Sequence, residues 1–165
     1  METFGLLRIC YPNFSEEKFR ETIPELLSTQ YSRSAQYCDS PGVTHCVSAV
    51  RYLIEKSTGW QLPYYYVGDM CRKILENHSI DAHLVPIEEG KIGDLIFFHR
   101  KSVAHKAYMI THVGILVDED SFFHSSWSKD GSIEKIQSRM HTGTIATCRQ
   151  LSSLTDPRSK KRKTL

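Results

Sequence analysis

The chain has 165 residues, of which 40% are hydrophobic and 10% aromatic, so it can bury one core, and its composition excludes a disordered chain and disfavours two domains. Its 21 Lys and Arg residues exceed its 19 Asp and Glu residues, but five of the bases stand in the last eight residues, at Arg158, Lys160, Lys161, Arg162 and Lys163. The rest therefore carries 16 bases against 19 acids, a charge of −3 that disfavours nucleic-acid binding by the folded body.

The N-terminal segment shows no export signal. The apolar run from Leu6 to Ile9 is short, and no small-residue cleavage pattern follows it, so it does not have the form of a secretory signal. No window of the sequence reaches the roughly 18 apolar residues of a membrane span. We therefore expect a cytoplasmic protein without a membrane span, with non-classical export as the other route.

The first predicted helix begins after Ser15, whose hydroxyl can cap the first turn. One face of this helix is apolar, at Phe19, Ile23 and Leu26. Pro24 is expected to kink or split it, because proline lacks a backbone N–H and its ring clashes with the preceding turn. Residues 31–43 are polar and end in Ser-Pro-Gly, which indicates a loop.

A second predicted helix starts at Thr44 and places Cys46 in its first turn. Apolar positions recur at helical spacing until Gly59, which is a typical stop, and Thr44 is the expected N-cap. Unpaired N–H groups and the helix dipole favour negative charge at such a position, so they favour the thiolate form of Cys46. A third, short helix is predicted for residues 68–78.

Beyond residue 81 the pattern changes from helical to strand periodicity. Short β-prone runs divided by turn sequences predict strands at 84–87, 94–99, 111–117, 121–125, 132–136 and 144–149. N-terminal helices followed by an antiparallel sheet of about five to six strands indicate the α+β class. We expect a helical extension at 1–36 packed on the domain, one domain at 37–150 and a basic, disordered tail at 151–165.

Two histidines on neighbouring predicted strands could complete a cysteine site. His112 opens an apolar strand, and His124 follows on the next one, where a cross-strand approach is geometrically reasonable. A cysteine nucleophile needs a histidine base and a third group that orients the histidine ring. The hypothesis is a Cys46–His112–His124 triad. The alternative is a small core cysteine and two structural histidines.

The other candidate groups are weaker evidence for a functional site. The five cysteines are an odd number without regular spacing, which indicates free thiols in a reducing compartment. No cofactor or metal is expected, because a zinc site at Cys38, His45 and Cys46 would lack a regular ligand pair and would occupy the nucleophile. The insert at 99–110 is either a solvated loop or a border of the substrate cleft, with basic side chains at Arg100, Lys101, His105 and Lys106.

Residues 37–149 resemble the NlpC/p60 family of papain-like cysteine peptidases. The resemblance rests on Cys46 at a helix start and on three later blocks, which are Gly93-Asp94-Leu95-Ile96-Phe97-Phe98, Thr111-His112-Val113-Gly114-Ile115 and Phe122-Phe123-His124-Ser125-Ser126. It implies a papain-like NlpC fold with the nucleophile at a helix start. It also implies that Cys46 is the nucleophile, His112 the general base and acid, and His124 the orienting residue.

The sequence departs from this family next to the nucleophile. The family usually places Asp before the cysteine and Ser-Gly after it, whereas this chain has His45 before it and Val47-Ser48 after it. His45 is interpreted as an exposed neighbour of the helix cap, with substrate or oxyanion contact as the other role. Tyr37 is the nearest candidate for the upstream tyrosine with which the family contacts substrate or oxyanion, and an ordinary loop or core tyrosine is the alternative.

The resemblance implies a hydrolase of amide bonds in peptidoglycan stem peptides, at the bond between γ-D-glutamyl and diaminopimelate. The partner would then be a stem peptide or another acidic peptide. A deamidase or acyltransferase that acts on a protein with the same triad is the second hypothesis, and a catalytically inactive binding module is the third. The order of Cys46 before His112 favours the hydrolase over circularly permuted acyltransferases. Composition does not indicate an oligomeric state.

Overall fold

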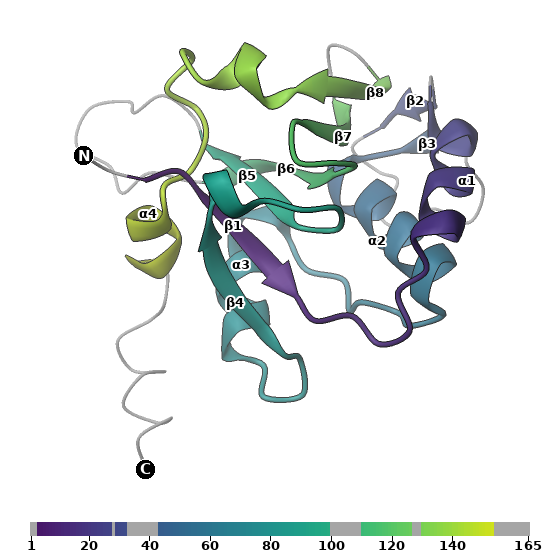
Figure 1. The fold of residues 1–165 in the computed structure, drawn as a ribbon, viewed down its shortest axis with the longest axis horizontal. Helices are drawn as coiled ribbons and strands as arrows, with labels where there is room; N and C mark the ends of the chain where they lie inside the picture. Colours follow the sequence, from purple (N-terminus) through teal and green to yellow (C-terminus); the bar gives the residue numbers. More distant parts are fainter. Residues whose placement is uncertain (1–2, 28, 33–42, 100–109, 127–129, 154–165) are drawn as a thin grey trace.

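The structure, a computed structural model, describes residues 3–27, 29–32, 43–99, 110–126 and 130–153. At its centre lies a six-stranded antiparallel sheet with the strand order β4-β1-β5-β6-β7-β8 (Figure 1). The strands of this sheet are β1 (Gly5–Ile9), β4 (Ala82–Pro86), β5 (Leu95–His99), β6 (Ile110–Leu116), β7 (Ser121–Ser126) and β8 (Asp130–Lys135). The predicted α+β class and antiparallel sheet are thereby confirmed.

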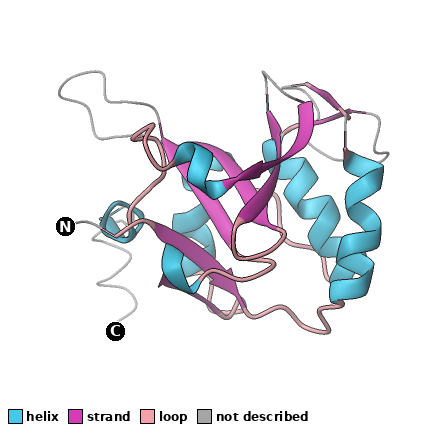
Figure 2. Ribbon diagram, turned by 45° about the horizontal axis from the view of Figure 1, so that its top comes forward, coloured by secondary structure: helices cyan, strands magenta, loops and turns pink. Residues whose placement is uncertain are grey.

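Four α-helices, two 3₁₀ turns and a small second sheet complete the described part of the chain. Figure 2 shows the helices and strands in a second view. The helices are α1 (Glu16–Leu26), α2 (Cys46–Thr58), α3 (Val67–Glu76) and α4 (Cys148–Ser153), and the 3₁₀ turns are η1 (Ile87–Glu89) and η2 (Ile136–Arg139). The second sheet pairs β2 (Gln30–Tyr31) with β3 (Val43–Thr44) in parallel.

Two strand predictions at the ends of the chain need correction. The run that begins at Leu6 forms β1, which lies between β4 and β5, and this strand was not predicted because its partners are far away in sequence. Residues 144–149, predicted as a strand, make only two isolated bridges, Phe4 to Thr147 and Phe98 to Ile145, before α4 begins at Cys148.

The first helix follows the sequence prediction except at proline. The Ser15 side chain accepts a hydrogen bond from the Lys18 backbone N–H at 3.1 Å, as the cap prediction requires. α1 continues through Pro24 to Leu26 as one helix, so the predicted split is wrong. Pro24 stands in the last turn, where the loss of one backbone donor disturbs the helix less than it would in the middle.

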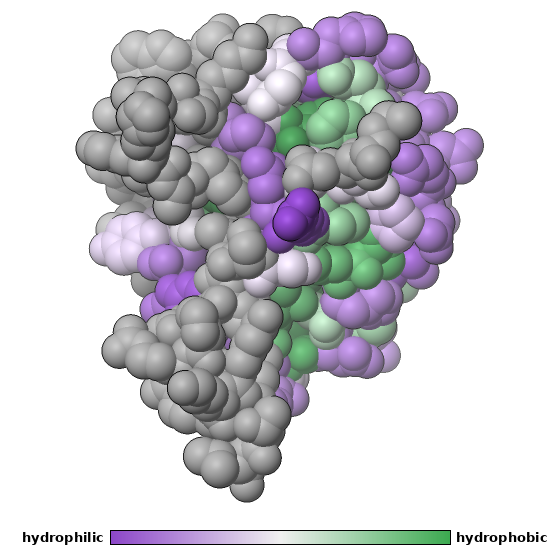
Figure 3. All heavy atoms as spheres, turned by 90° about the vertical axis from the view of Figure 1, so that its left-hand side faces the viewer, coloured by the Kyte–Doolittle hydropathy of each residue, from purple (hydrophilic) through white to green (hydrophobic). Residues whose placement is uncertain are grey.

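The two faces of the sheet carry separate apolar layers because strand side chains alternate between faces. One layer packs under the helices, and α2 and α3 both contact β6 there; its strand residues include Phe97, Val113 and Ile115. The other layer includes Phe98 and Phe122 from alternate positions. From the side of the N-terminal segment and α4, an area of apolar residues is visible with hydrophilic residues at its border (Figure 3).

Within the described ranges, none of the helices combines the length and the apolarity that crossing a membrane requires.

Candidate active site

Cys46 is the first residue of α2 and is nearly buried, with 6% of its surface exposed. The N-cap is His45, not the predicted Thr44: the ring Nδ1 of His45 accepts hydrogen bonds from the backbone N–H groups of Val47 at 3.2 Å and Ser48 at 3.5 Å. The interpretation of His45 as an exposed neighbour is also wrong, because its exposed fraction is only 6%. The backbone N–H of Cys46 takes part in neither of these two cap hydrogen bonds.

A pocket of about 420 Å³ opens at this helix start. Its lining consists of Tyr31, His45, Cys46, Val47, Tyr64, Tyr66, Val67, Gly68, Ile110 and Thr111. The ring of Tyr64 lies edge-on to both His45 and Tyr66, with ring centroids 5.9 Å and 6.0 Å apart. Tyr66 is 70% exposed, so it offers a free aromatic face at the mouth of the pocket. A ligand that reaches Cys46 would therefore pass aromatic side chains.

The two predicted histidines are in direct contact. His112 lies near the start of β6 and His124 near the end of β7, and the structure places His112 Nε2 2.7 Å from His124 Nδ1. The rings are nearly perpendicular, with centroids 5.0 Å apart, and His124 is fully buried. The pKa of His112 is lowered from 6.5 to about 3, mainly by burial and then by the neighbouring His124 and Arg139, against Glu134, which raises it. His112 is therefore an uncharged base at neutral pH.

The sulfur of Cys46 lies against β6, the strand that carries His112. Burial raises the pKa of the thiol, and the backbone N–H groups of Val113, Val47 and Cys46 act in the opposite direction. Val113 is the residue after His112, so the thiol and the imidazole belong to one stretch of β6. Between these two described side chains, however, the structure contains no hydrogen bond from Sγ to the imidazole.

A carboxylate and a guanidinium lie behind the histidine pair, and neither was predicted as part of the site. His124 Nε2 is 2.7 Å from Oε2 of Glu134 on β8. Arg139, in η2, donates to both oxygens of Glu134 at 2.9 Å and stacks over the Phe98 ring at 5.3 Å. The β7–β8 register pairs His124 with Ser132 and Phe122 with Glu134, so Glu134 lies on the same face of the sheet as His124, two residues further along β8.

The remaining residues singled out in the sequence are Tyr37, the basic insert and Asp94. Tyr37 and the basic insert, with Arg100, Lys101, His105 and Lys106, lie outside the described residues. Asp94, from the first family-like block, accepts a hydrogen bond from the backbone N–H of Lys91 at 2.9 Å. In addition, Asp94 forms a two-point ion pair with Arg8 of β1, at 3.0 Å and 2.8 Å.

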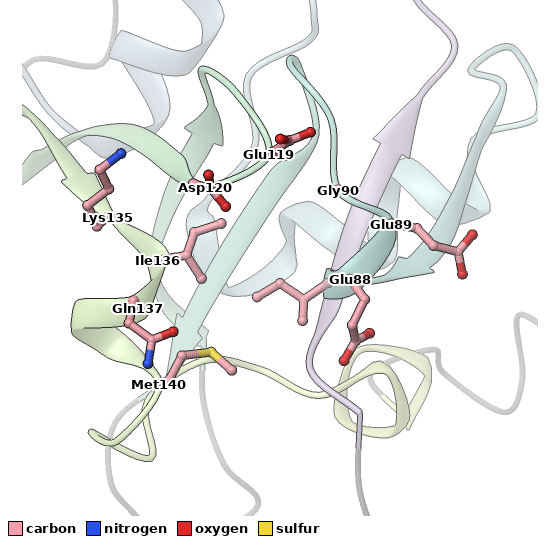
Figure 4. Close-up of a pocket in the computed structure, with 10 residues that line it drawn as sticks. Glu88, Glu89, Gly90, Glu119, Asp120, Lys135, Ile136, Gln137 and Met140 are labelled. Carbon is pink, nitrogen blue, oxygen red and sulfur yellow. The ribbon is translucent and has the colours of Figure 1, made fainter.

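Two further features of the described structure have groups that could bind a ligand. Cys10, Asp81 and His83 could together hold a metal ion, because their ligand atoms lie within 4.8 Å of one another; all three are exposed, and none lines the Cys46 pocket. A larger hollow of about 800 Å³ is lined by β8, η1 and η2. Its four carboxylates point in different directions and do not converge on one position (Figure 4); they belong to Glu88, Glu89, Glu119 and Asp120. It shares no lining residue with the Cys46 pocket.

Comparisons with known proteins agree on one family. The sequence model of the NlpC/P60 family matches residues 32–150. A search of curated proteins finds no significant match.

Solved structures show the same fold at low sequence identity. An NLP/P60 family protein from Staphylococcus aureus, described as similar to lipoprotein, is 18% identical over 84% of this chain and 43% of its own, with a TM-score of 0.59. NlpC1 from Trichomonas vaginalis is 16% identical over 84% of this chain and 44% of its own, with a TM-score of 0.53. An NlpC/P60 family protein from Bacillus cereus is 16% identical over 82% and 40%, with a TM-score of 0.52. The chain thus spans less than half the length of each of these proteins.

Proposed function

Since the chain belongs to the NlpC/P60 family, we propose that it is a cysteine hydrolase that cleaves an amide bond in peptidoglycan stem peptides, of the γ-D-glutamyl–diaminopimelate type, with Cys46 as nucleophile. His112 is the general base and acid, and His124 orients it. One observation carries the proposal: the contact of 2.7 Å between His112 Nε2 and His124 Nδ1, on the strand against which the Cys46 sulfur lies.

The charge states favour proton transfer during attack over a preformed ion pair. Burial keeps the Cys46 thiol protonated and His112 uncharged at neutral pH. As Sγ bonds to the substrate carbonyl carbon, the thiol proton passes to His112 Nδ1. His112 then gives this proton to the leaving amine, the C–N bond breaks, and a thioester remains. Water, deprotonated by His112, hydrolyses the thioester and regenerates the thiol.

This sequence of steps requires the thiol and the imidazole to meet in the substrate complex. Catalytic hydrogen bonds are often long in unliganded enzymes and tighten when substrate binds. The tetrahedral intermediate carries an oxyanion, for which the backbone N–H of Cys46 is the first donor we propose. It belongs to the first helical turn, where backbone donors have no partner within the helix, and the His45 ring caps the amides of Val47 and Ser48 instead.

The test is to incubate the protein with stem peptides and with their amidated forms, and to read the products by mass spectrometry. Scission at the γ-D-glutamyl bond is the expected result, and Cys46→Ala should abolish it while leaving the far-ultraviolet circular dichroism spectrum unchanged. Full activity of Cys46→Ala would refute Cys46 as the nucleophile. A unit mass gain without scission would instead identify a deamidase. Tight binding of a stem peptide without any product would refute the proposal and indicate a binding module. A thiol-reactive probe should label the wild type at Cys46.

A further inference from the structure

The histidine pair ends on a buried carboxylate that is itself held from behind. The side chain of Glu134 is only 12% exposed, its Oε2 is 2.7 Å from His124 Nε2, and both of its oxygens accept hydrogen bonds from Arg139 at 2.9 Å. Ser138 Oγ donates a further bond to Oε1 at 3.2 Å. A charge-assisted two-point pair of this kind fixes the plane of the carboxylate as well as its position.

This arrangement determines which ring nitrogens carry protons. His124 Nε2 and Glu134 Oε2 are at ion-pair distance, 2.7 Å, without the alignment of a hydrogen bond. A bare ring nitrogen this close to an ionised carboxylate would place two lone pairs against each other, so the proton of His124 belongs on Nε2. Neutral imidazole has one N–H, so His124 Nδ1 is then an acceptor, and His112 must donate to it from Nε2. The remaining nitrogen of His112, Nδ1, is thereby left as a lone pair. That is the nitrogen that the proposed mechanism uses as base.

We propose that Glu134 is a positioning residue that sets the tautomers of His124 and His112 through its contact with His124, and that Arg139, paired with both oxygens of Glu134, moderates the effect of that carboxylate on His112. The inference rests on the proposed function for its catalytic meaning, although the tautomers are a property of the resting protein. Glu134 approaches His124 at Nε2, whereas His112 contacts His124 at Nδ1, so Glu134 and Arg139 act on His112 through His124.

Glu134 and Arg139 shift the pKa of His112 in opposite directions. Three described groups act on His112: His124 from β7, Glu134 from β8 and Arg139 from η2. Burial is the largest cause of the lowered pKa of His112; Arg139 lowers it further and Glu134 raises it. When His112 takes up the thiol proton, Glu134 therefore stabilises the imidazolium, and Arg139 limits that stabilisation.

The test uses two substitutions whose effects should differ. In Glu134→Gln the acceptor charge is lost, so we expect a mixed tautomer of His124 and a kcat at least about tenfold lower, with KM within about twofold. In Arg139→Gln the carboxylate remains, so both Nε2–H tautomers should persist, and the acid limb of the pH profile of kcat/KM should move to higher pH. Glu119→Gln, an exposed acid on the β7 turn, is the matched control and should behave as the wild type.

Imidazole ¹⁵N chemical shifts at pH 7 report the tautomers directly, and they can be recorded on the inactive Cys46→Ala background without any substrate. A purely structural role would lower kcat through loss of folded protein without changing these signals. The inference is overturned if Glu134→Gln keeps both tautomers, or if Arg139→Gln changes them as Glu134→Gln does. Lack of stem-peptide cleavage by the wild type, with the expected tautomers present, would instead overturn the proposed function alone.

Discussion

The ion pair between Asp94 and Arg8 ties the N-terminal strand to the turn that enters β5, and replacing Asp94 by Asn tests how much it contributes. Asp94 is 1% exposed and accepts two hydrogen bonds from Arg8 and one from the Lys91 backbone. Asparagine has nearly the same shape but only one acceptor oxygen, so its amide group must face donors. Breaking a buried pair by removing one partner costs about 3–5 kcal/mol.

The lower end of that range applies because 18% of the Arg8 side chain is exposed and can be rehydrated. We therefore expect Asp94→Asn to lower the free energy of unfolding by about 3 kcal/mol, which corresponds to a Tm about 6–12 °C lower for a chain of this size. Urea unfolding followed by tryptophan fluorescence measures the first quantity, and calorimetry measures the second. Activity of the folded protein should not change.

A double-mutant cycle with Arg8→Gln separates the pair from its surroundings. The double variant should lose less stability than the two single variants together, with a coupling energy of about 1–3 kcal/mol. Glu16→Gln is the control: its pair with Arg20 has a similar length, 2.9 Å, but lies on the surface, where such pairs contribute about 0–1 kcal/mol. An Asp94→Asn variant within about 0.5 kcal/mol of the wild type, or additive single variants, would refute the reasoning.

Three further predictions concern His112, two glycines and the α2 cap. The pKa of His112 is lower in the folded protein, about 3, than the 6.5 of the unfolded chain, so only the unfolded chain gains its proton between these values. Stability should therefore fall as the pH drops below 6.5, by about 2 kcal/mol at pH 5, and His112→Gln should lose this part of the dependence in urea unfolding. Gly131→Ala should destabilise far more than Gly59→Ala, because its Cβ would lie 2.0 Å from the Leu26 carbonyl oxygen whereas Gly59 has open space and only a positive φ of +74°; calorimetry compares the two. His45→Ala should cost about 1 kcal/mol through loss of the cap, and His45→Asp should restore it.

Each of these has a contradicting result. A pH dependence that is the same in His112→Gln and the wild type would mean that His112 titrates normally in the folded protein. Equal Tm values for Gly131→Ala and Gly59→Ala would show that the contact between β8 and the end of α1 can open at little cost. A His45→Asp variant as unstable as His45→Ala would show that the ring contributes through packing on Tyr64 and not through its acceptor nitrogen.

The sequence was informative where a local rule determines the structure. Gly59 ends α2 with a left-handed φ of 74°, as a glycine stop requires, and Ser15 caps α1 through its hydroxyl. The two histidines could be placed together because they lie on consecutive strands. Their catalytic role stays a prediction, which the Cys46→Ala and Glu134→Gln variants test.

The sequence was less informative where partners are distant or where two residues compete for one place. β1 is a short apolar run, and only pairing with β4 and β5, far along the chain, makes it a strand. Thr44 is a better cap by propensity than His45, but the Nδ1 of His45 reaches the amides of the first turn. In the sequence, Glu134 resembles an ordinary surface acid. Its burial depends on the β7–β8 register and on its pairing with Arg139.

The position of β1 has a consequence for how the molecule folds. Gly5 pairs with Pro86, 81 residues later, and Leu6 pairs with Ile96, 90 residues later. β5 to β8, in contrast, form a meander of sequential neighbours that can close early. Until β1 inserts, β4 and β5 each expose an unpaired edge, which is a template for association with other chains. Refolding should therefore be slow, as high contact order implies, and its yield should fall as protein concentration rises.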